Sequence, residues 1–191
     1  MLGETASAKA KREQGLSIDH VELVPPTAKP LPEVLEAIRE ADVIILGPGS
    51  LYTSIIPNLL VEGMSEAILS AGALRLYVLN IMTQDGETEC YTAGQHVESI
   101  LSHAGGSVID ACIYNTRIAH KRLLARYALE GSEPLYPEGD SFSRMGIQLL
   151  GYDMLSRSGM LARHDPLRLA YGVMDACRKL RPRAAKLGDY D

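Results

Sequence analysis

One stretch decides how this chain folds, Ala41-Asp42-Val43-Ile44-Ile45-Leu46-Gly47-Pro48-Gly49-Ser50-Leu51-Tyr52-Thr53-Ser54. Its apolar run of residues 43–46 ends abruptly in a Gly-Pro-Gly-Ser turn, and hydroxyl side chains follow. The run predicts a strand that is buried on both faces. Glycine lets the backbone approach a ligand closely, and a helix that begins after the turn favours an anion at its N-terminus. The stretch therefore predicts a phosphate site at the carboxyl end of a buried strand.

Apolar strand patterns alternate with helical patterns along the rest of the chain. Strands are predicted over 18–24, 43–46, 74–80, 108–114 and 147–150. Helices are predicted over 32–41, 51–60, 64–71, 92–104 and 117–130 and from Pro166 onward, with loops over 82–91 and 133–144. This alternation predicts an α/β fold in which helices cover both faces of a parallel sheet. We expect a single domain over 1–191, with a flexible arm over 1–15 and a flexible tail over 182–191.

The composition narrows the class of protein. The chain has 191 residues, of which 46% are hydrophobic, which is enough for one domain with a core. Its net charge of −5 argues against non-specific binding to nucleic acid or to an anionic membrane. The cysteines Cys90, Cys112 and Cys177 are odd in number and far apart, as is typical of a reducing compartment. Because no apolar run approaches the roughly 20 residues of a membrane helix, we expect a cytoplasmic protein without a membrane span or a nucleic-acid partner.

Three loops follow apolar strands directly and open with Gly or Asn, over 47–54, 80–92 and 115–116. Ligands of parallel sheets bind beyond the carboxyl ends of the strands, so these loops are expected to converge on one site. The amide and hydroxyl groups of the second loop can bond sugar hydroxyls or a base edge. Its carboxylates at Asp85, Glu87 and Glu89 could hold a metal or a ribose diol. The alternative is that this loop is polar only because it is an exposed turn.

The sequence offers no catalytic group with an evident partner. His164 beside Asp165 resembles an acid–base pair, but Asp165 is well placed to cap the helix that Pro166 opens. No nucleophile is paired with a base, and no metal-ligand spacing is recognisable. We therefore assign no catalytic residue, no metal ligand and no required cofactor.

Residues 41–60 resemble the YvcK/CofD-like family, which contains bacterial gluconeogenesis factors and 2-phospho-L-lactate transferase. Further matches are Gly3-Glu4, Asn80-Ile-Met-Thr-Gln, Gly86-Glu-Thr, Tyr91-Thr and His96-Val97. The Gly-Pro-Gly-Ser-Leu-Tyr-Thr-Ser run is more similar to the gluconeogenesis-factor branch. Asp85 and the Glu89-Cys90 pair depart from the family's usual residues. The family opens with a glycine-rich nucleotide loop that has no counterpart here, so we expect the C-terminal portion of a larger domain that lacks its first strands.

The resemblance implies a Rossmann-like fold and a nucleotide-sugar ligand of the UDP-N-acetylglucosamine type. It also implies a regulatory role in carbon metabolism and in cell-wall and cell-shape homeostasis, and we expect a homodimer. The residues expected to bind the ligand are Gly47, Pro48, Gly49, Ser50, Thr53, Ser54, Asn80, Thr83, Gln84, Gly86, Glu87 and Thr88. The alternatives are a transferase that acts on a nucleotide-activated donor, as in 2-phospho-L-lactate transferase, and a truncated chain that folds only with a partner.

Overall fold

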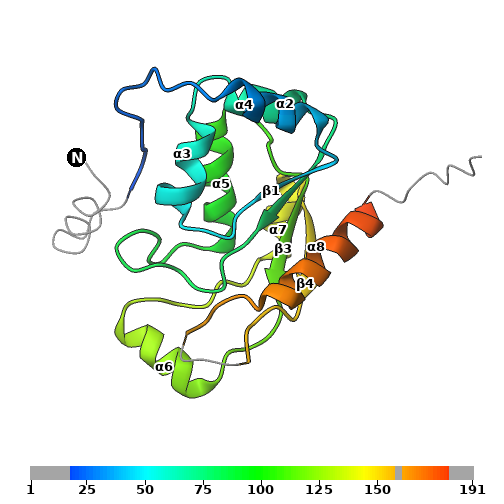
Figure 1. Ribbon diagram of the computed structural model, residues 1–191. Coiled ribbons are helices and arrows are strands. Elements are labelled where there is room, and N and C mark those ends of the chain that lie inside the picture. Colours follow the sequence, from blue (N-terminus) through cyan, green and yellow to red (C-terminus); the bar gives the residue numbers. More distant parts are fainter. Residues whose placement is uncertain (1–17, 158–160, 181–191) are drawn as a thin grey trace, which may run out of the picture.

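The computed structural model describes residues 18–157 and 161–180, so the predicted arm over 1–15 and tail over 182–191 lie outside the described residues (Figure 1). The strands are β1 (Val43–Leu46), β2 (Leu74–Val78), β3 (Ala111–Asn115) and β4 (Gln148–Tyr152). The helices are α2 (Pro32–Glu40), η1 (Leu51–Ile55, a π-helix), α3 (Ile56–Leu59), α4 (Met64–Ser70), α5 (Ala93–Ala104), α6 (Lys121–Leu129), α7 (Gly139–Arg144) and α8 (Pro166–Leu180).

The strands form one parallel sheet in the order β1-β2-β3-β4. Each strand therefore pairs with the next one along the chain, and helical segments make every crossover. Because all strands run in one direction, their carboxyl ends meet at one edge of the sheet, and α6 lies beyond that edge (Figure 1). The chain thus has the α/β fold with a parallel sheet that the alternation of elements predicts, and it is Rossmann-like, as the family resemblance implies.

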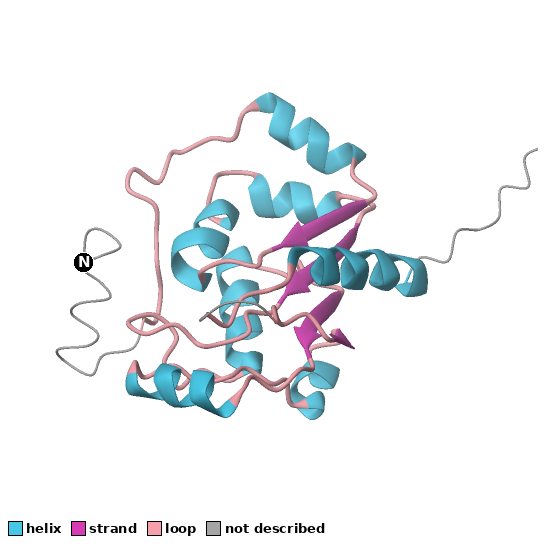
Figure 2. Cartoon of the chain, turned by 60° about the horizontal axis from the view of Figure 1, so that its bottom comes forward, coloured by secondary structure: helices cyan, strands magenta, loops and turns pink. Residues whose placement is uncertain are grey.

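Helices cover both faces of the sheet, as predicted (Figure 2). On one face, η1, α3, α4, α5 and α7 pack against side chains such as Tyr77 and Cys112 in the larger core. On the other face, α8 packs through Ala176 against Leu76 and Ile113 in a smaller core. A third cluster lies under α6 at the carboxyl edge and includes Ile81, Met82, Ala119 and Leu155. The sheet is therefore the middle of three layers, and its carboxyl edge stays accessible between them.

Two predicted helix starts are confirmed by their caps. Thr92 opens α5 with a capping box, in which its hydroxyl accepts from the backbone N–H of Gln95 and its own N–H donates to the Gln95 side chain. Asp165 precedes α8, and its Oδ1 accepts from the backbone N–H groups of Leu167 and Arg168, both at 3.1 Å. These caps fix where each helix begins.

The strand predicted over 18–24 is wrong. The segment has no strand partner among residues 18–157 and 161–180, and side chains of η1, α5 and the second loop bind its backbone. The Ile18 carbonyl accepts from the hydroxyls of Tyr52 and Tyr91, and the Val21 N–H donates to Nε2 of His103. Its apolar side chains still pack against the larger core. The alternating pattern of 18–24 thus arises because one side of this segment packs against helices, and not because the segment is a strand of the sheet.

The full burial expected of 43–46 is also wrong. β1 is an edge strand, and the side chain of Ile45 is 45% exposed.

The other differences between prediction and structure concern where elements begin and end. β3 begins at Ala111, after the predicted 108, and α6 begins only at Lys121, where His120 accepts from the N–H of Arg122. The predicted loop over 133–144 contains α7, whose Phe142 is fully buried and anchors it to the larger core.

Candidate functional site

The first loop turns sharply at Gly47, directly after β1. Its φ of +82° lies in the left-handed region that favours glycine, and a Cβ there would approach the carbonyl oxygen of Val78 to 3.1 Å. Gly49 does not have a left-handed φ; a Cβ there would instead come within 3.3 Å of the Cβ of Ser54. The Gly49 carbonyl accepts from Nδ2 of Asn80 at 2.8 Å. The turn is therefore held to the carboxyl end of β2.

A protein carboxylate lies at the helix start where we expected a phosphate. The backbone N–H of Tyr52, in the first turn of η1, donates to Oε1 of Glu87 at 3.1 Å. The Glu87 side chain comes from the second loop and is only 4% exposed. An anion at this position complements the partial positive charge of the helix start. Glu87 thus fixes the second loop to the first, and its contact with a ligand stays a prediction.

Other polar residues of the second loop also bond within the protein. The Ser50 hydroxyl donates to Oε1 of Gln84 at 2.7 Å, and the Gln84 N–H donates to Oγ1 of Thr88. Thr83 is buried, and its Oγ1 accepts from the N–H of Glu133 at 2.8 Å. These bonds tie the second loop to the first loop and to the backbone at Glu133.

Half of the predicted site residues line one cavity of about 620 Å³ at the carboxyl edge of β1 and β2: Pro48, Gly49, Ser50, Asn80, Thr83 and Gln84. The other half, Gly47, Thr53, Ser54, Gly86, Glu87 and Thr88, are not among its lining residues. The volume is in the range of small-molecule sites. The convergence expected of the first two loops is therefore present, with half of the residues that were assigned to it.

The third loop, at residues 115–116, stabilises the fold through the side chain of Asn115. Oδ1 of Asn115 accepts from the backbone N–H groups of Arg117, Met154 and Leu155 at 3.0 to 3.2 Å, and its Nδ2 donates to the Arg117 carbonyl at 2.7 Å. The side chain is 4% exposed and does not line the cavity. Asn115 therefore ties the ends of β3 and β4 together.

The wall that sequence reasoning missed comes from residues just before α8. Ala162, Arg163 and His164 line the cavity together with residues of the two loops, and Arg163 is exposed. Ala162 is held there because its N–H donates to the Tyr127 hydroxyl of α6 at 3.0 Å. The signal for this wall in the sequence is the Arg163-His164-Asp165 run directly before the helix-opening Pro166.

His164 is the titratable group with a perturbed environment in this wall. Burial is the larger effect and lowers its pKa below the usual 6.5, while an interaction with the Leu79 carbonyl acts in the opposite direction. The imidazole is thus neutral at pH 7. Its Nε2 is buried without a hydrogen-bond partner among the described residues. Asp165 caps α8, as described above, so the predicted capping role holds.

The residues that line the cavity therefore include neutral hydrogen-bonding side chains and one arginine. Amide and hydroxyl groups suit a sugar or a base edge, and a guanidinium suits a phosphate. Over residues 18–157 and 161–180, no group of three or more His, Cys, Asp or Glu side chains is arranged to hold a metal ion. None of the helices in that part of the chain is long and apolar enough to cross a bilayer.

Comparisons with known proteins agree with this architecture. The family model described as 2-phospho-L-lactate transferase CofD matches residues 1–155. The gluconeogenesis factor of Halalkalibacterium halodurans is 39% identical over 176 residues, which are 92% of this chain and 53% of that protein. The gluconeogenesis factor of Bacillus subtilis is 37% identical over 167 residues, 87% of this chain and 53% of that protein.

A crystal structure of a UPF0052 family member from Bacillus halodurans superposes with a TM-score of 0.82 at 36% identity. The match covers 87% of this chain and 54% of that one. The chain thus spans about half the length of the curated relatives described above.

Proposed function

We propose, on the premise that this chain belongs to the 2-phospho-L-lactate transferase CofD family, that it binds a nucleotide sugar of the UDP-N-acetylglucosamine type reversibly. One observation carries the proposal: Ser50, Asn80 and Gln84 share a cavity of about 620 Å³ with Arg163. A nucleotide sugar combines a diphosphate with a ring rich in hydroxyls. The guanidinium would pair with the diphosphate, and the amides would bond the hydroxyls.

The binding is tested by calorimetry with UDP-N-acetylglucosamine and, for comparison, GDP. We expect saturable binding of the nucleotide sugar, and we expect Arg163→Gln to weaken it by about tenfold or more, as for loss of a hydrogen bond to a charged group. The matched control is Arg39→Gln on α2, where Arg39 is exposed and pairs with Glu36. Equal affinities for wild type and Arg163→Gln would refute the proposed role of Arg163, and absence of saturable binding would refute the proposed ligand.

We favour a regulator over an enzyme because the cavity's lining residues bind and orient without supplying a nucleophile paired with a base. Regulation of carbon metabolism is the role that we propose, since curated relatives are named gluconeogenesis factors. The proposal extends to regulation of cell shape and to the cytoplasm, which the family resemblance alone implies. The proposal extends to a homodimer, whose mass can be measured in solution.

The runner-up function is transfer of a group from a nucleotide-activated donor, as the family name suggests. Incubation with labelled UDP-N-acetylglucosamine, magnesium and a panel of alcohol acceptors separates the two functions. Intact nucleotide sugar, recovered quantitatively and identified by mass, is the result expected of a regulator. Catalytic release of UMP or UDP would instead establish the transferase.

A further inference from the structure

Three arginines meet at one carboxylate beyond the end of β4. Oδ2 of Asp153 lies 2.7 Å from Nη1 of Arg168, 3.0 Å from Nη1 of Arg117 and 3.8 Å from Nη2 of Arg157. Arg168 also reaches the backbone carbonyl of Asp153 at 3.3 Å. We call these four residues the arginine cluster. Arg117 follows β3, Asp153 follows β4, and Arg168 stands in the first turn of α8, so the fold itself brings them together.

The arginine cluster carries more charge and more donors than its carboxylate can satisfy. Three guanidinium groups and one carboxylate leave two positive charges in a chain whose net charge is −5. Each guanidinium presents five N–H donors, and all three ion pairs end on the same oxygen. The side chains are 31 to 63% exposed, and a solvated ion pair contributes little to stability. Holding β4 to α8 would need one arginine, not three.

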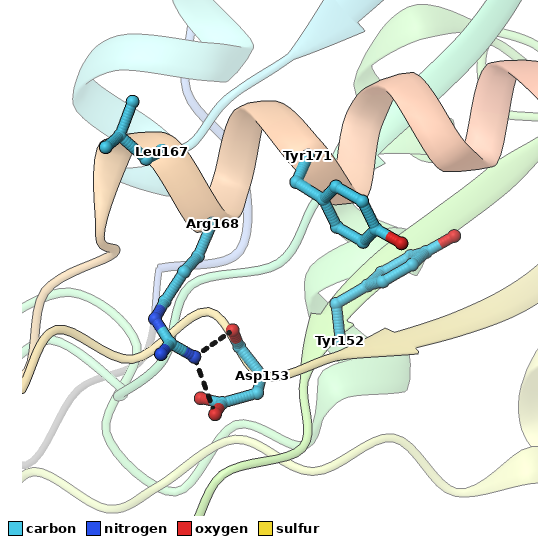
Figure 3. A pocket seen from close by; sticks show the side chains of 5 residues that line it. All are labelled: Tyr152, Asp153, Leu167, Arg168 and Tyr171. Carbon is cyan, nitrogen blue, oxygen red and sulfur yellow. Dashed lines mark hydrogen bonds and ion pairs between the residues drawn. The ribbon is translucent and has the colours of Figure 1, made fainter.

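A hollow beside the arginine cluster provides room for a ligand. It has a volume of about 340 Å³ and is lined by Tyr152, Asp153, Leu167, Arg168 and Tyr171 (Figure 3). Asp153 and Arg168 are thus the members of the arginine cluster that line the hollow, and Arg117 and Arg157 adjoin it through Asp153. Arg168 is directed at Asp153, and the rings of Tyr152 and Tyr171 stand together farther along α8 (Figure 3). The Tyr152 hydroxyl is held by Asp175 at 2.9 Å, whereas Tyr171 is 65% exposed. Charge at one end and an aromatic surface at the other define what would fit.

We propose that this hollow binds a small phosphate monoester with a flat apolar body, its phosphate on the arginine cluster and its body against Tyr171. A phosphate suits this end of the hollow because Arg168 lines it and the other two guanidinium groups meet at the same Asp153 oxygen, so that several phosphate oxygens can each take a charge-assisted bond from a planar fork of donors. A flat ring gains contact area by stacking on an exposed tyrosine. The hollow shares no lining residue with the cavity of Arg163, so the two sites are separate and this proposal does not depend on the proposed function.

The test uses phenyl phosphate as the probe, with the full chain at low ionic strength, where surface charges are least screened. Calorimetry is expected to give saturable binding that Arg168→Gln weakens by about tenfold or more. The control Arg39→Gln is expected to bind as wild type does, because Arg39 lies on α2. Circular dichroism checks that Arg168→Gln is folded, and Arg117→Gln gives an independent second variant. Saturable binding in wild type that neither arginine variant changes, or no saturable binding, would overturn the proposal.

Asp153→Asn distinguishes a ligand site from a purely structural ion-pair network. In a ligand site the carboxylate competes with phosphate, so its removal is expected to tighten phenyl phosphate binding by several fold. Unchanged or weaker binding in a folded Asp153→Asn variant would contradict the proposed site. Tyr171→Ala tests the apolar end: it is expected to reduce the affinity for phenyl phosphate to that for inorganic phosphate. No change in phenyl phosphate affinity would refute the stacking role.

Discussion

Removing the Asn115 side chain is expected to destabilise the whole domain. Asn115→Ala deletes the acceptor of three backbone N–H groups, of which those of Met154 and Leu155 belong to buried residues. A buried donor left without a partner costs about 1–3 kcal/mol. The two buried donors together therefore cost about 2–6 kcal/mol. A free-energy change near 4 kcal/mol corresponds to a fall in Tm of roughly 8–16 °C for a domain of this size.

Urea denaturation followed by far-UV circular dichroism measures this change. The midpoint is expected to fall while the denaturant dependence of the unfolding free energy stays the same, which would show that stability alone has changed. Asn58→Ala is the matched control, because Asn58 is exposed and makes its bond at the surface of α3 to the Ser54 carbonyl. A loss below about 1 kcal/mol for Asn115→Ala would show that water replaces the lost acceptor, and would refute the assigned role of this side chain.

Three further predictions concern the cavity and the histidines. Gly49→Val is expected to weaken nucleotide-sugar binding at least about tenfold, because it places a branched side chain in the cavity lining, where a Cβ at position 49 would already lie 3.3 Å from the Cβ of Ser54. Wild-type affinity in calorimetry would instead show that the turn only connects β1 to η1. Gln84→Ala is expected to change the ranking of affinities among nucleotide sugars, because loss of a polar partner in the site costs about 1–3 kcal/mol of binding free energy. An unchanged ranking would contradict the assignment of Gln84 to the ligand site. Burial lowers the pKa of both His96 and His164, so the unfolded chain binds more protons below pH 6.5. The unfolding free energy is therefore expected to be highest above that pH and to fall as the pH drops below it. In His164→Gln this fall is expected to be shallower. Urea midpoints measured at several pH values test both expectations.

The sequence was sufficient for the fold because its periodic patterns are long and its boundaries carry specific residues. Several of these signals act locally, so they can be recognised without knowledge of the rest of the structure: the Thr92 capping box, the Asp165 cap, and the apolar strand runs that end at Gly47 and Asn80. Edge position is a global property. The exposure of Ile45 depends on what lies beside β1, and the apolar run 43–46 is equally compatible with a central strand.

The site could be predicted only in outline for a similar reason. The predicted strand ends indicate where the loops converge. The direction in which each loop side chain points depends on partners that are distant in the sequence. Glu87 turns inward because a free N–H of Tyr52 lies 35 residues earlier, and Asn115 turns inward because β4 ends beside it. Arg163 comes to the cavity because α6 holds its neighbour Ala162. No local pattern encodes these contacts.

The position of β1 has a consequence for handling this chain in solution. Its main-chain groups on the side away from β2 have no strand partner among residues 18–157 and 161–180, and Ile45 adds an exposed apolar side chain there. Such an edge is a template on which another extended chain can add, and natural proteins commonly place a charge there to prevent it. We therefore expect concentrated preparations to aggregate through this strand, at a rate that falls on dilution. A lysine in place of Ile45 would act as a gatekeeper and keep the chain monodisperse without touching either ligand cavity.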